Sequence, residues 1–493
     1  MVRGIIIKIS AMCILMILAA VLLTVCNNSL DAYIKNDEIK VQEAGILAAP
    51  EKNITGSVIT GHEEIVLTFD ETIDKSSLLL GGDLGDLSPF IFWDKTAFED
   101  DTLRINKDSL PIWTEGSGKT LTISCEAVSG KVLTGYSVTF DVFYGTCVDD
   151  DSTVTEKNGS VKKPYDTIQA GIDQANAKYV MPVNGIDTAE VRVSGGDYEK
   201  VCEISTPTYV ADIKEGISLY GGYDVYFASR NPTVDVSYII DTSIIGGTST
   251  VNTVRAFNAD GSSVTITAST IIDGFTITIG KENGHHCGIA CKNGANPTIS
   301  NITIQGRGSS EQSGYAYGML LYHSAARVEQ CTIDPGNSTS ESYGILCSLT
   351  DSPHPTIDSN TISGGVSDST FGIYIQAGSN VTVTENTITG GDWTDGSYGI
   401  CIVVEESSPV ITDNTLRIYG NLSSTYGVYE TSETSDPASV RRNDFDYDGS
   451  WYRDEAATTI DKNNYNSTTV STGEGTDYLF GTWANYSTAT GLP

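Results

Sequence analysis

The stretch GIYIQAGSNVTVTENTI at residues 372–388 decides the fold of this chain, because its pattern recurs along the sequence. Related stretches are GIACKNGANPTISNITI at 288–304, GILCSLTDSPHPTIDSNTI at 344–362 and GICIVVEESSPVITDNTL at 399–416. Each stretch begins with glycine and isoleucine and carries an asparagine close to its end. A repeat of this length predicts stacked supersecondary units rather than one closed globule.

Two columns of residues recur in these units. In the glycine column an aromatic residue precedes glycine at 317–318, 343–344, 371–372, 398–399 and 426–427, and Cys287-Gly288 heads the series. The asparagine column comprises Asn301, Asn360, Asn386, Asn414 and Asn443, with Gly274 and Cys331 in the same slot of two other units. Asparagine tolerates left-handed backbone, and its amide can pair with the neighbouring unit, so this column predicts a bend in every unit.

The glycine column also predicts which face of each unit is buried. On a strand, positions −1, +1 and +3 relative to glycine point the same way. They hold the aromatic residue, then an aliphatic residue, then Cys291, Leu321, Cys347, Ile375 or Ile402. We therefore expect the aromatic column in the core, and the alternative is a sugar-stacking platform. Cys291 and Cys347 lie two units apart, about 9–10 Å, which is too far for a disulfide.

The first 26 residues resemble a bacterial lipoprotein signal peptide. Arg3 and Lys8 precede a short apolar run from Cys13 to Val25, which is too short to span a bilayer comfortably. The run ends in Leu-Thr-Val-Cys, which resembles a lipobox and implies lipidation of Cys26. Ordinary cleavage or an uncleaved anchor is the alternative. In each case we expect an exported chain, lipid-anchored at the cell surface or outer membrane if Cys26 is modified.

The charge balance limits the partners. The chain has 63 acidic and 29 basic residues, a formal net charge of −34. Such a field repels polyanions, so we expect no nucleic-acid partner, and acidic polysaccharides are disfavoured unless a metal or a basic cleft intervenes. We expect a monomer that meets the membrane only through its N-terminal lipid and binds a glycan or a cell-surface protein. The sequence does not decide whether Cys125, Cys147 or Cys202 form disulfides.

Three further regions follow the signal. Residues 27–52 resemble a tether, and alternating strands over 53–145 resemble a bacterial Ig-like β-sandwich. Ile168, Ile172 and Ala175 have helical spacing, which predicts a short amphipathic helix within 165–177. With the repeats, this segment resembles the start of pectate-lyase-like, right-handed parallel β-helix domains, in which such a helix covers the first coil. The resemblance implies an all-β chain with a β-helix over 146–450, followed by a C-terminal cap over 451–493.

The same family contains lyases, hydrolases and epimerases that act on uronate polymers, but the matching residues are missing here. The Asp-Pro-His triplet of the epimerases is replaced by Asp351-Ser352-Pro353-His354. The outward carboxylates of the central units have no basic partner at matching positions; they are Glu385, Asp392, Asp395, Glu405, Glu406 and Asp413. Arg307, Arg327 and Arg417 occur singly in separate units. We therefore assign no catalytic residue.

Metal sites are equally poorly supported by the sequence. His285, His286, Cys287 and Cys291 resemble a zinc cluster, but no second pair at ligand spacing accompanies them. A structural calcium at a turn is compatible with the many Asp and Asn residues, but the sequence does not locate it. We assign no metal ligand and no cofactor.

One loop is a candidate ligand site. Trp393 lies between Asp392 and Asp395 in the expected loop 390–396, where an exposed indole could stack on a neutral sugar and the carboxylates could accept its hydroxyl hydrogens. The indole could equally pack against a neighbouring loop. We expect a non-catalytic surface protein that binds a glycan or protein. The alternatives are a polysaccharide lyase or hydrolase and a purely structural or antigenic surface protein.

Overall fold

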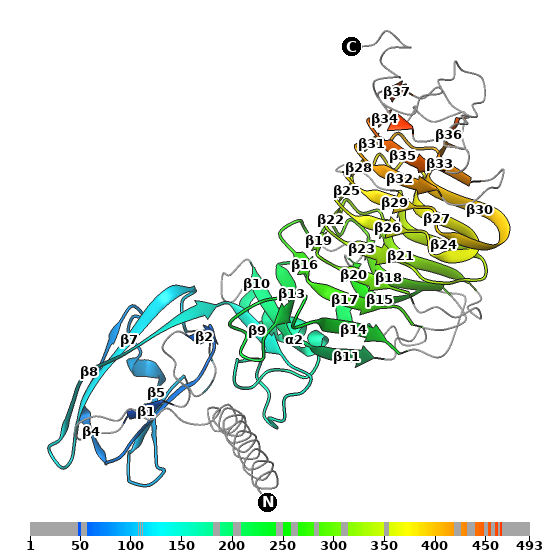
Figure 1. Cartoon of the computed structure of the whole chain (residues 1–493). Helices are drawn as coiled ribbons and strands as arrows, with labels where there is room; N and C mark the ends of the chain where they lie inside the picture. The colour runs from blue at the N-terminus through cyan, green and yellow to red at the C-terminus, as the bar shows by residue number, and fades with distance from the viewer. Residues whose placement is uncertain are drawn as a thin grey trace, which may run out of the picture. The chain divides into compact units, whose positions relative to one another are not determined.

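The computed structural model describes residues 48–50, 57–106, 108, 110, 112–180, 188–200, 209–242, 250–257, 265–280, 285–306, 314–349, 354–418, 425–430, 439–447, 452–454, 459–461 and 464–465. The predicted signal with Cys26 lies outside this set, as does Cys202. Two compact units comprise residues 1–143 with 160–162, and residues 144–159 with 163–493 (Figure 1). In the described part of the chain, no helix is long and apolar enough to cross a membrane.

The first unit is a β-sandwich. One sheet has the strand order β1 (Ala48–Pro50), β3 (Ile65–Phe69), β6 (Thr102–Ile105), β5 (Ile91–Asp94). The other has the order β2 (Ser57–Thr60), β8 (Val132–Phe143), β7 (Gly116–Ala127), β4 (Ile73–Gly82). Alternating side chains of both sheets, such as Leu67 and Phe140, share one buried core with Trp113. The tether was predicted one strand too long, because residues 48–50 pair with β3.

The second unit is a solenoid of three parallel sheets, which the chain visits in the repeating order C, D, E (Figure 1). Sheet C contains β9 (Gly145–Val148), β10 (Ala189–Ser194), β13 (Ile217–Tyr223), β16 (Ile271–Asp273), β19 (Thr298–Ser300), β22 (Arg327–Glu329), β25 (Thr356–Asp358), β28 (Thr382–Thr384), β31 (Val410–Thr412), β34 (Ser439–Arg441) and β37 (Thr459–Asp461). Sheet D contains β11 (Gly196–Lys200), β14 (Ser237–Asp241), β17 (Phe275–Thr278), β20 (Thr303–Gln305), β23 (Thr332–Asp334), β26 (Thr361–Ser363), β29 (Thr387–Thr389), β32 (Thr415–Ile418), β35 (Asp444–Tyr447) and β38 (Asn464–Tyr465).

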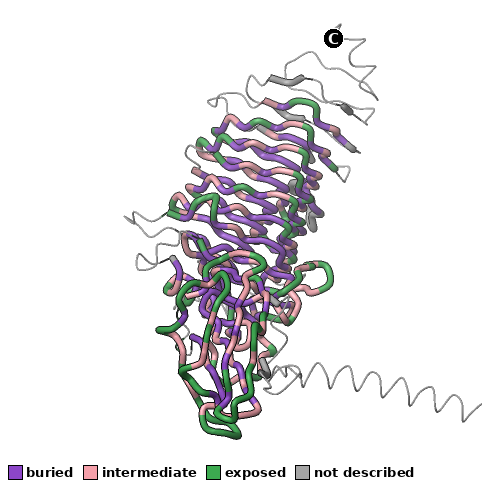
Figure 2. Tube along the Cα trace, turned by 90° about the vertical axis from the view of Figure 1, so that its left-hand side faces the viewer, coloured by how far each residue is buried: buried purple, intermediate pink, exposed green. Residues whose placement is uncertain are grey.

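Sheet E contains β12 (Ala211–Asp212), β15 (Thr250–Phe257), β18 (His285–Lys292), β21 (Tyr315–Tyr322), β24 (Glu341–Ser348), β27 (Val366–Gln376), β30 (Asp392–Val404), β33 (Thr425–Glu430) and β36 (Tyr452–Asp454). One strand from each sheet makes a coil, and buried residues follow one another along the stacked strands (Figure 2). The predicted start of the cap at residue 451 is too early, because β36, β37 and β38 continue the three sheets.

The predicted amphipathic helix is confirmed as α2 (Ile168–Ala175). The hydroxyl of Thr167 accepts a hydrogen bond from the Ala170 amide at the helix N-terminus. Ile168, Ile172 and Ala175 are buried in the same core as the sheets of the solenoid. The helix therefore supplies apolar cover at β9 and β10, where the first coil has no neighbour.

The bend between sheets C and D uses two adjacent positions rather than one. The first has left-handed backbone and holds Gly274, Asn301, Gln330, Ser359, Glu385, Asp413 and Arg442. The second holds Phe275, Ile302, Cys331 and then the asparagine ladder, which comprises Asn360, Asn386, Asn414 and Asn443. The prediction that Gly274 and Asn301 share a column with the ladder was therefore wrong by one residue, since both occupy the first position and the ladder occupies the second. The residue at the first position provides the left-handed backbone, and the asparagine at the second position provides the hydrogen bonds between coils.

The ladder is a chain of buried hydrogen bonds. The Asn386 side-chain oxygen accepts from the backbone amide of Asn360 at 2.8 Å. The Asn386 side-chain amide donates to the carbonyls of Ile357 and Thr384, at 2.9 and 2.7 Å. Cys331 begins the series, with its amide donating to Asn360 at 2.8 Å. The free, buried Cys331 thus packs in the column as predicted.

The glycine column of sheet E is interrupted in the coil after Gly372 and resumes at Tyr426-Gly427, since Tyr426 pairs with Ile400. A register shift in the pairing of β27 with β30 sets Tyr398 opposite Ser369 and Ile400 opposite Phe371. Tyr398-Gly399 is therefore not the next member of the column. That position is taken by Ile400-Cys401, and Ile375 pairs with Val404 rather than with Ile402. The even spacing of the glycines in the sequence therefore does not reveal the register shift between β27 and β30.

Tyr343, Phe371 and Tyr426 of the aromatic column are buried as predicted, but the predicted orientation is wrong because they lie in a cluster separate from the core of the solenoid. A Cβ atom added at Gly344 or Gly372 would lie 2.5 Å from Cγ2 of Ile362 or Ile388, so the glycine itself faces the core. The strand bends at the glycine. The residues one and three positions after it, such as Ile345 and Cys347, enter the core, whereas the residue before it and the residue two positions after it, such as Tyr343 and Leu346, lie outside the core. Counting by two through a bend assigns the aromatic residue to the wrong face.

Candidate functional site

The displaced aromatic side chains form a separate cluster on the outer side of sheet E, which we name the aromatic face. Its residues are Tyr315, Tyr317, Tyr343, Leu346, Phe371, Tyr374, Ile400, Val403, Tyr426 and Tyr429. The rings of Tyr343 and Phe371 stack with centroids 5.1 Å apart, and those of Tyr317 and Tyr343 with centroids 5.2 Å apart. These separations are close to the spacing of adjacent strands, so successive coils hold the rings in register.

The aromatic face is partly open. Tyr343 and Phe371 retain 8% and 7% of their exposure, because their faces are covered by neighbouring rings. Tyr317, Tyr374 and Tyr429 are half-buried. Tyr374 meets both Tyr343 and Phe371 edge-on, with centroids 5.6 and 5.2 Å away. The surface therefore offers ring edges and partly covered rings, on a base that packing holds rigid.

Two glutamates are held against this face. The hydroxyl of Tyr374 donates to the Glu405 carboxylate at 2.8 Å, and the hydroxyl of Tyr343 donates to Glu341. Burial raises the pKa of both tyrosines, and the adjacent carboxylates raise it further because they accept from the neutral hydroxyl. The two hydroxyls consequently remain protonated donors over the physiological pH range.

The predicted ligand residues lie on a strand of the same sheet. Asp392, Trp393 and Asp395 belong to the first half of β30, whose second half contributes Ile400 and Val403 to the aromatic face. The prediction of a loop at 390–396 is wrong, because Asp392 pairs with Val366 and Trp393 with Ser367. The side chains of these three residues lie outside what the structure describes.

The suspected zinc cluster does not assemble. Cys291 is buried inside the solenoid, whereas Cys287 belongs to a small cluster with Ala290 and Leu320 on the outer side of sheet E. The His285 ring stacks on Tyr315 with centroids 4.6 Å apart, and its Nδ1 accepts from the Tyr315 amide at 3.1 Å. Burial lowers the pKa of His285 and raises that of Cys287 to about 12. Among the described residues no group of three His, Cys, Asp or Glu side chains could hold a metal ion.

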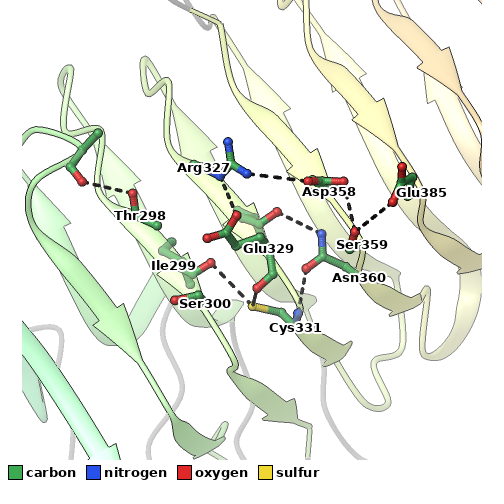
Figure 3. Close-up of polar contacts among 12 residues, drawn as sticks. Thr298, Ile299, Ser300, Arg327, Glu329, Cys331, Asp358, Ser359, Asn360 and Glu385 are labelled. Atoms are coloured by element: carbon green, nitrogen blue, oxygen red, sulfur yellow. Dashed lines mark hydrogen bonds and ion pairs between the residues drawn. The ribbon is translucent and has the colours of Figure 1, made fainter.

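A second polar group, which we name the charged corner, lies outside the bend between sheets C and D (Figure 3). It comprises Arg327, Glu329, Asp358, Ser359 and Glu385. Arg327 lies 2.6 Å from Glu329 and 3.7 Å from Asp358. The Ser359 hydroxyl lies within hydrogen-bonding distance of two carboxylates, Asp358 at 3.1 Å and Glu385 at 3.5 Å, and can donate to either. Arg327, which occurs singly in the sequence, has two carboxylate partners: Glu329 on the same strand and Asp358 one coil further along.

The other predicted candidates are separate from one another. Asp413 accepts from Arg442 of the next coil at 2.7 Å, so this carboxylate also has a basic partner that the sequence did not reveal. Glu406 and Arg417 are exposed. His354 is exposed, and the other residues of its motif, 351–353, lie outside the described residues, as does Arg307.

Comparison with known proteins identifies the architecture. The family model described as "Right handed beta helix region" matches residues 202–416 and 336–481. Among solved structures, the chain is similar to the A-module of mannuronan C-5 epimerase AlgE4 from Azotobacter vinelandii, with 13% identity, a TM-score of 0.25, and coverage of 62% of this chain and 95% of that one.

Two other similar structures are an exopolygalacturonase and the catalytic domain of an alpha-1,3-glucanase. For the family 28 exopolygalacturonase of Yersinia enterocolitica, the identity is 9%, the TM-score 0.19, and the coverage 83% of this chain and 95% of that one. For the catalytic domain of a GH87 alpha-1,3-glucanase, the values are 11%, 0.23, 88% and 91%. No curated protein matches the chain by sequence.

Proposed function

The chain belongs to the right-handed β-helix family, and from that premise we propose that its solenoid is a non-catalytic module that binds a glycan on the aromatic face. The binding surface would extend across the successive strands β21, β24, β27, β30 and β33 of sheet E. We further propose that lipid at Cys26 anchors the protein at a bacterial cell surface, with the Ig-like sandwich as a spacer.

The observation that carries this proposal is the pair of tyrosine–glutamate hydrogen bonds within an apolar aromatic cluster. Sugar-binding surfaces combine aromatic carbon, which packs on the C–H faces of a sugar ring, with a few fixed polar groups that orient its hydroxyls. Ring stacking and hydrogen bonding hold Tyr343, Tyr374, Glu341 and Glu405 in place before a ligand arrives. Little side-chain entropy is then lost on binding.

The alternative is a polysaccharide lyase or hydrolase, and one specific observation favours it. The charged corner brings two carboxylates, Glu329 and Asp358, to one arginine, and carboxylates are among the groups that act in general acid–base chemistry. However, Arg327 and Glu329 neutralise each other in a mutual ion pair. In addition, the Arg327 side chain is 51% exposed, so water screens its charge. We therefore rank catalysis second, and a purely structural or antigenic role third.

The test uses the chain without residues 1–26, incubated with neutral, acidic and amine-bearing polysaccharides, with and without calcium. Retention on a polymer without new reducing ends or unsaturated products is the expected result. Tyr374→Phe keeps the ring but removes the hydroxyl that holds Glu405, and should weaken retention several-fold because the carboxylate is no longer fixed before the ligand arrives. Arg327→Gln at the charged corner is the matched control and should bind normally. Turnover that this control abolishes would replace the proposal with the enzyme.

A further inference from the structure

The two carboxylates of the aromatic face have tyrosine hydroxyls as their partners. In the part of the chain that the structure describes, Glu341 and Glu405 accept from tyrosine hydroxyls and pair with no lysine or arginine. At the charged corner, by contrast, Glu329 and Asp358 lie beside Arg327. A carboxylate can accept about four hydrogen bonds, so one tyrosine leaves most of its capacity unused.

The surroundings of these carboxylates favour a cationic partner. Both glutamates are half-buried beside apolar rings, where a charge is less hydrated and an opposite charge is attracted more strongly than in water. The half-buried rings of Tyr374 and Tyr429 add the negative faces of aromatic π-systems, which also attract ammonium groups. A neutral sugar could use only the hydrogen-bonding capacity of this arrangement, whereas a uronate would be repelled by it.

The charge of the whole chain acts in the same direction. A net charge of −34 concentrates cations near the surface and excludes polyanions. We infer that the aromatic face selects a glycan bearing free amino groups, whose ammonium ions bind Glu341 and Glu405 while the sugar rings pack on the tyrosines. This inference rests on the proposed glycan-binding function and specifies the class of glycan.

The experiment compares two ligands that differ only in the amine. The full chain is titrated at about pH 6, where ordinary amines are protonated, with glucosamine oligomers and with the same oligomers after complete N-acetylation. We expect acetylation to weaken binding at least tenfold, the scale of one lost charge-assisted pair. Raising the salt concentration should weaken binding of the amine form alone.

Three variants assign the effect to the face. Glu341→Gln and Glu405→Gln keep an oxygen that accepts from the tyrosine hydroxyl, so both should fold, and each should reduce the preference for the amine form several-fold. Glu385→Gln, at the charged corner, is the control and should retain the full preference. The comparison of the two oligomers needs no variant, so it remains decisive even if a substitution impairs folding.

The outcomes separate this inference from the function on which it rests. Equal binding of amine and acetylated oligomers would overturn the selectivity and leave glycan binding intact. Binding of neither oligomer nor any polymer of the panel would overturn both. A preference that survives in Glu341→Gln and Glu405→Gln would place the amine site elsewhere, and would also contradict the inference.

Discussion

The asparagine ladder and the aromatic face run along the same coils, but different interactions hold them. In the ladder, each buried amide bonds to the next coil and to backbone carbonyls, so every polar atom is used within the protein. On the aromatic face, rings stack between coils and two carboxylates retain unused acceptor capacity. The comparison teaches that a column whose hydrogen-bonding groups are all used within the protein stabilises the solenoid, whereas a column with unused acceptors can bind a ligand.

Removing a rung of the ladder should have the largest effect. Asn386→Ala leaves the Asn360 amide and two carbonyls buried with fewer partners, which should lower the free energy of unfolding by about 3–5 kcal/mol. Chemical denaturation measures the change. Asn380→Ala is the control, since Asn380 is exposed and accepts one bond from the Ser408 amide at 2.9 Å. A loss of less than about 1 kcal/mol in Asn386→Ala would show that the ladder is not structural.

A methyl group inside the bend of sheet E should have the next largest effect. In Gly344→Ala the new Cβ would lie 2.5 Å from Ile362 Cγ2, against the closely packed core, so we expect a loss of about 2–3 kcal/mol. Gly378→Ala is the comparison, since it has open space and only the strain of a positive φ of 79°, with a cost of about 1 kcal/mol. If thermal denaturation shows the two variants equally stable, the glycine does not face the core.

Removing a hydroxyl from the aromatic face should change binding but not folding. Tyr343→Phe preserves the stacked ring and deletes the donor to Glu341, so the melting temperature should stay within a few degrees of that of the unchanged protein. Glycan affinity should fall several-fold. Paired calorimetric titrations and thermal scans separate the two quantities. A large loss of stability with unchanged affinity would make the face structural, like the ladder.

A smaller effect should be the pH dependence of stability that arises from His285, which stacks on Tyr315 of the aromatic face. Burial places the folded-state pKa of His285 below its ordinary value of 6.5, so the unfolded chain takes up the proton first. Stability should therefore be unaffected at high pH and fall as the pH drops below about 6.5. Melting temperatures between about pH 8 and 5 measure it. His285→Gln should reduce the slope, and an unchanged slope in this variant would contradict the assignment.

The smallest effect belongs to the charged corner. Arg327 is 51% exposed and its pairs are screened by water, so Arg327→Gln should lower the free energy of unfolding by less than about 1 kcal/mol. The difference should shrink further at high salt. Denaturation at low and high salt provides the measurement. A loss of unfolding free energy as large as that expected for Asn386→Ala would show that the charged corner stabilises the fold as the ladder does.

The sequence predicts the columns better than their orientation. The asparagines from Asn360 onward locate the bend correctly, because in each coil the buried side-chain amide bonds to the asparagine of the next coil. The orientation of the aromatic column was mispredicted because the glycine bends its strand, and Tyr398-Gly399 was misaligned because a register shift in β30 compensates for the spacing. The pairing of Arg327 with Asp358 depends on contacts between coils, which the local sequence does not show.

The candidate site was predicted only in part. Trp393 directed attention to β30, which does contribute to the aromatic face, but Glu341 was not a candidate and Glu405 was considered only as one of several outward carboxylates. Their role depends on tyrosines of neighbouring strands: Glu405 follows β30, whereas Tyr374 belongs to β27. No spacing within one coil encodes such a pair.

The most direct test of a ligand-binding aromatic face is carboxyl footprinting by carbodiimide labelling and mass spectrometry, with and without glucosamine oligomers. Glu341 and Glu405 should become protected by the ligand, and Glu385, an exposed carboxylate of the same solenoid, should label equally in both states. Unchanged labelling of Glu341 and Glu405 at saturating ligand would contradict the account, because the glycan would then bind elsewhere or not at all.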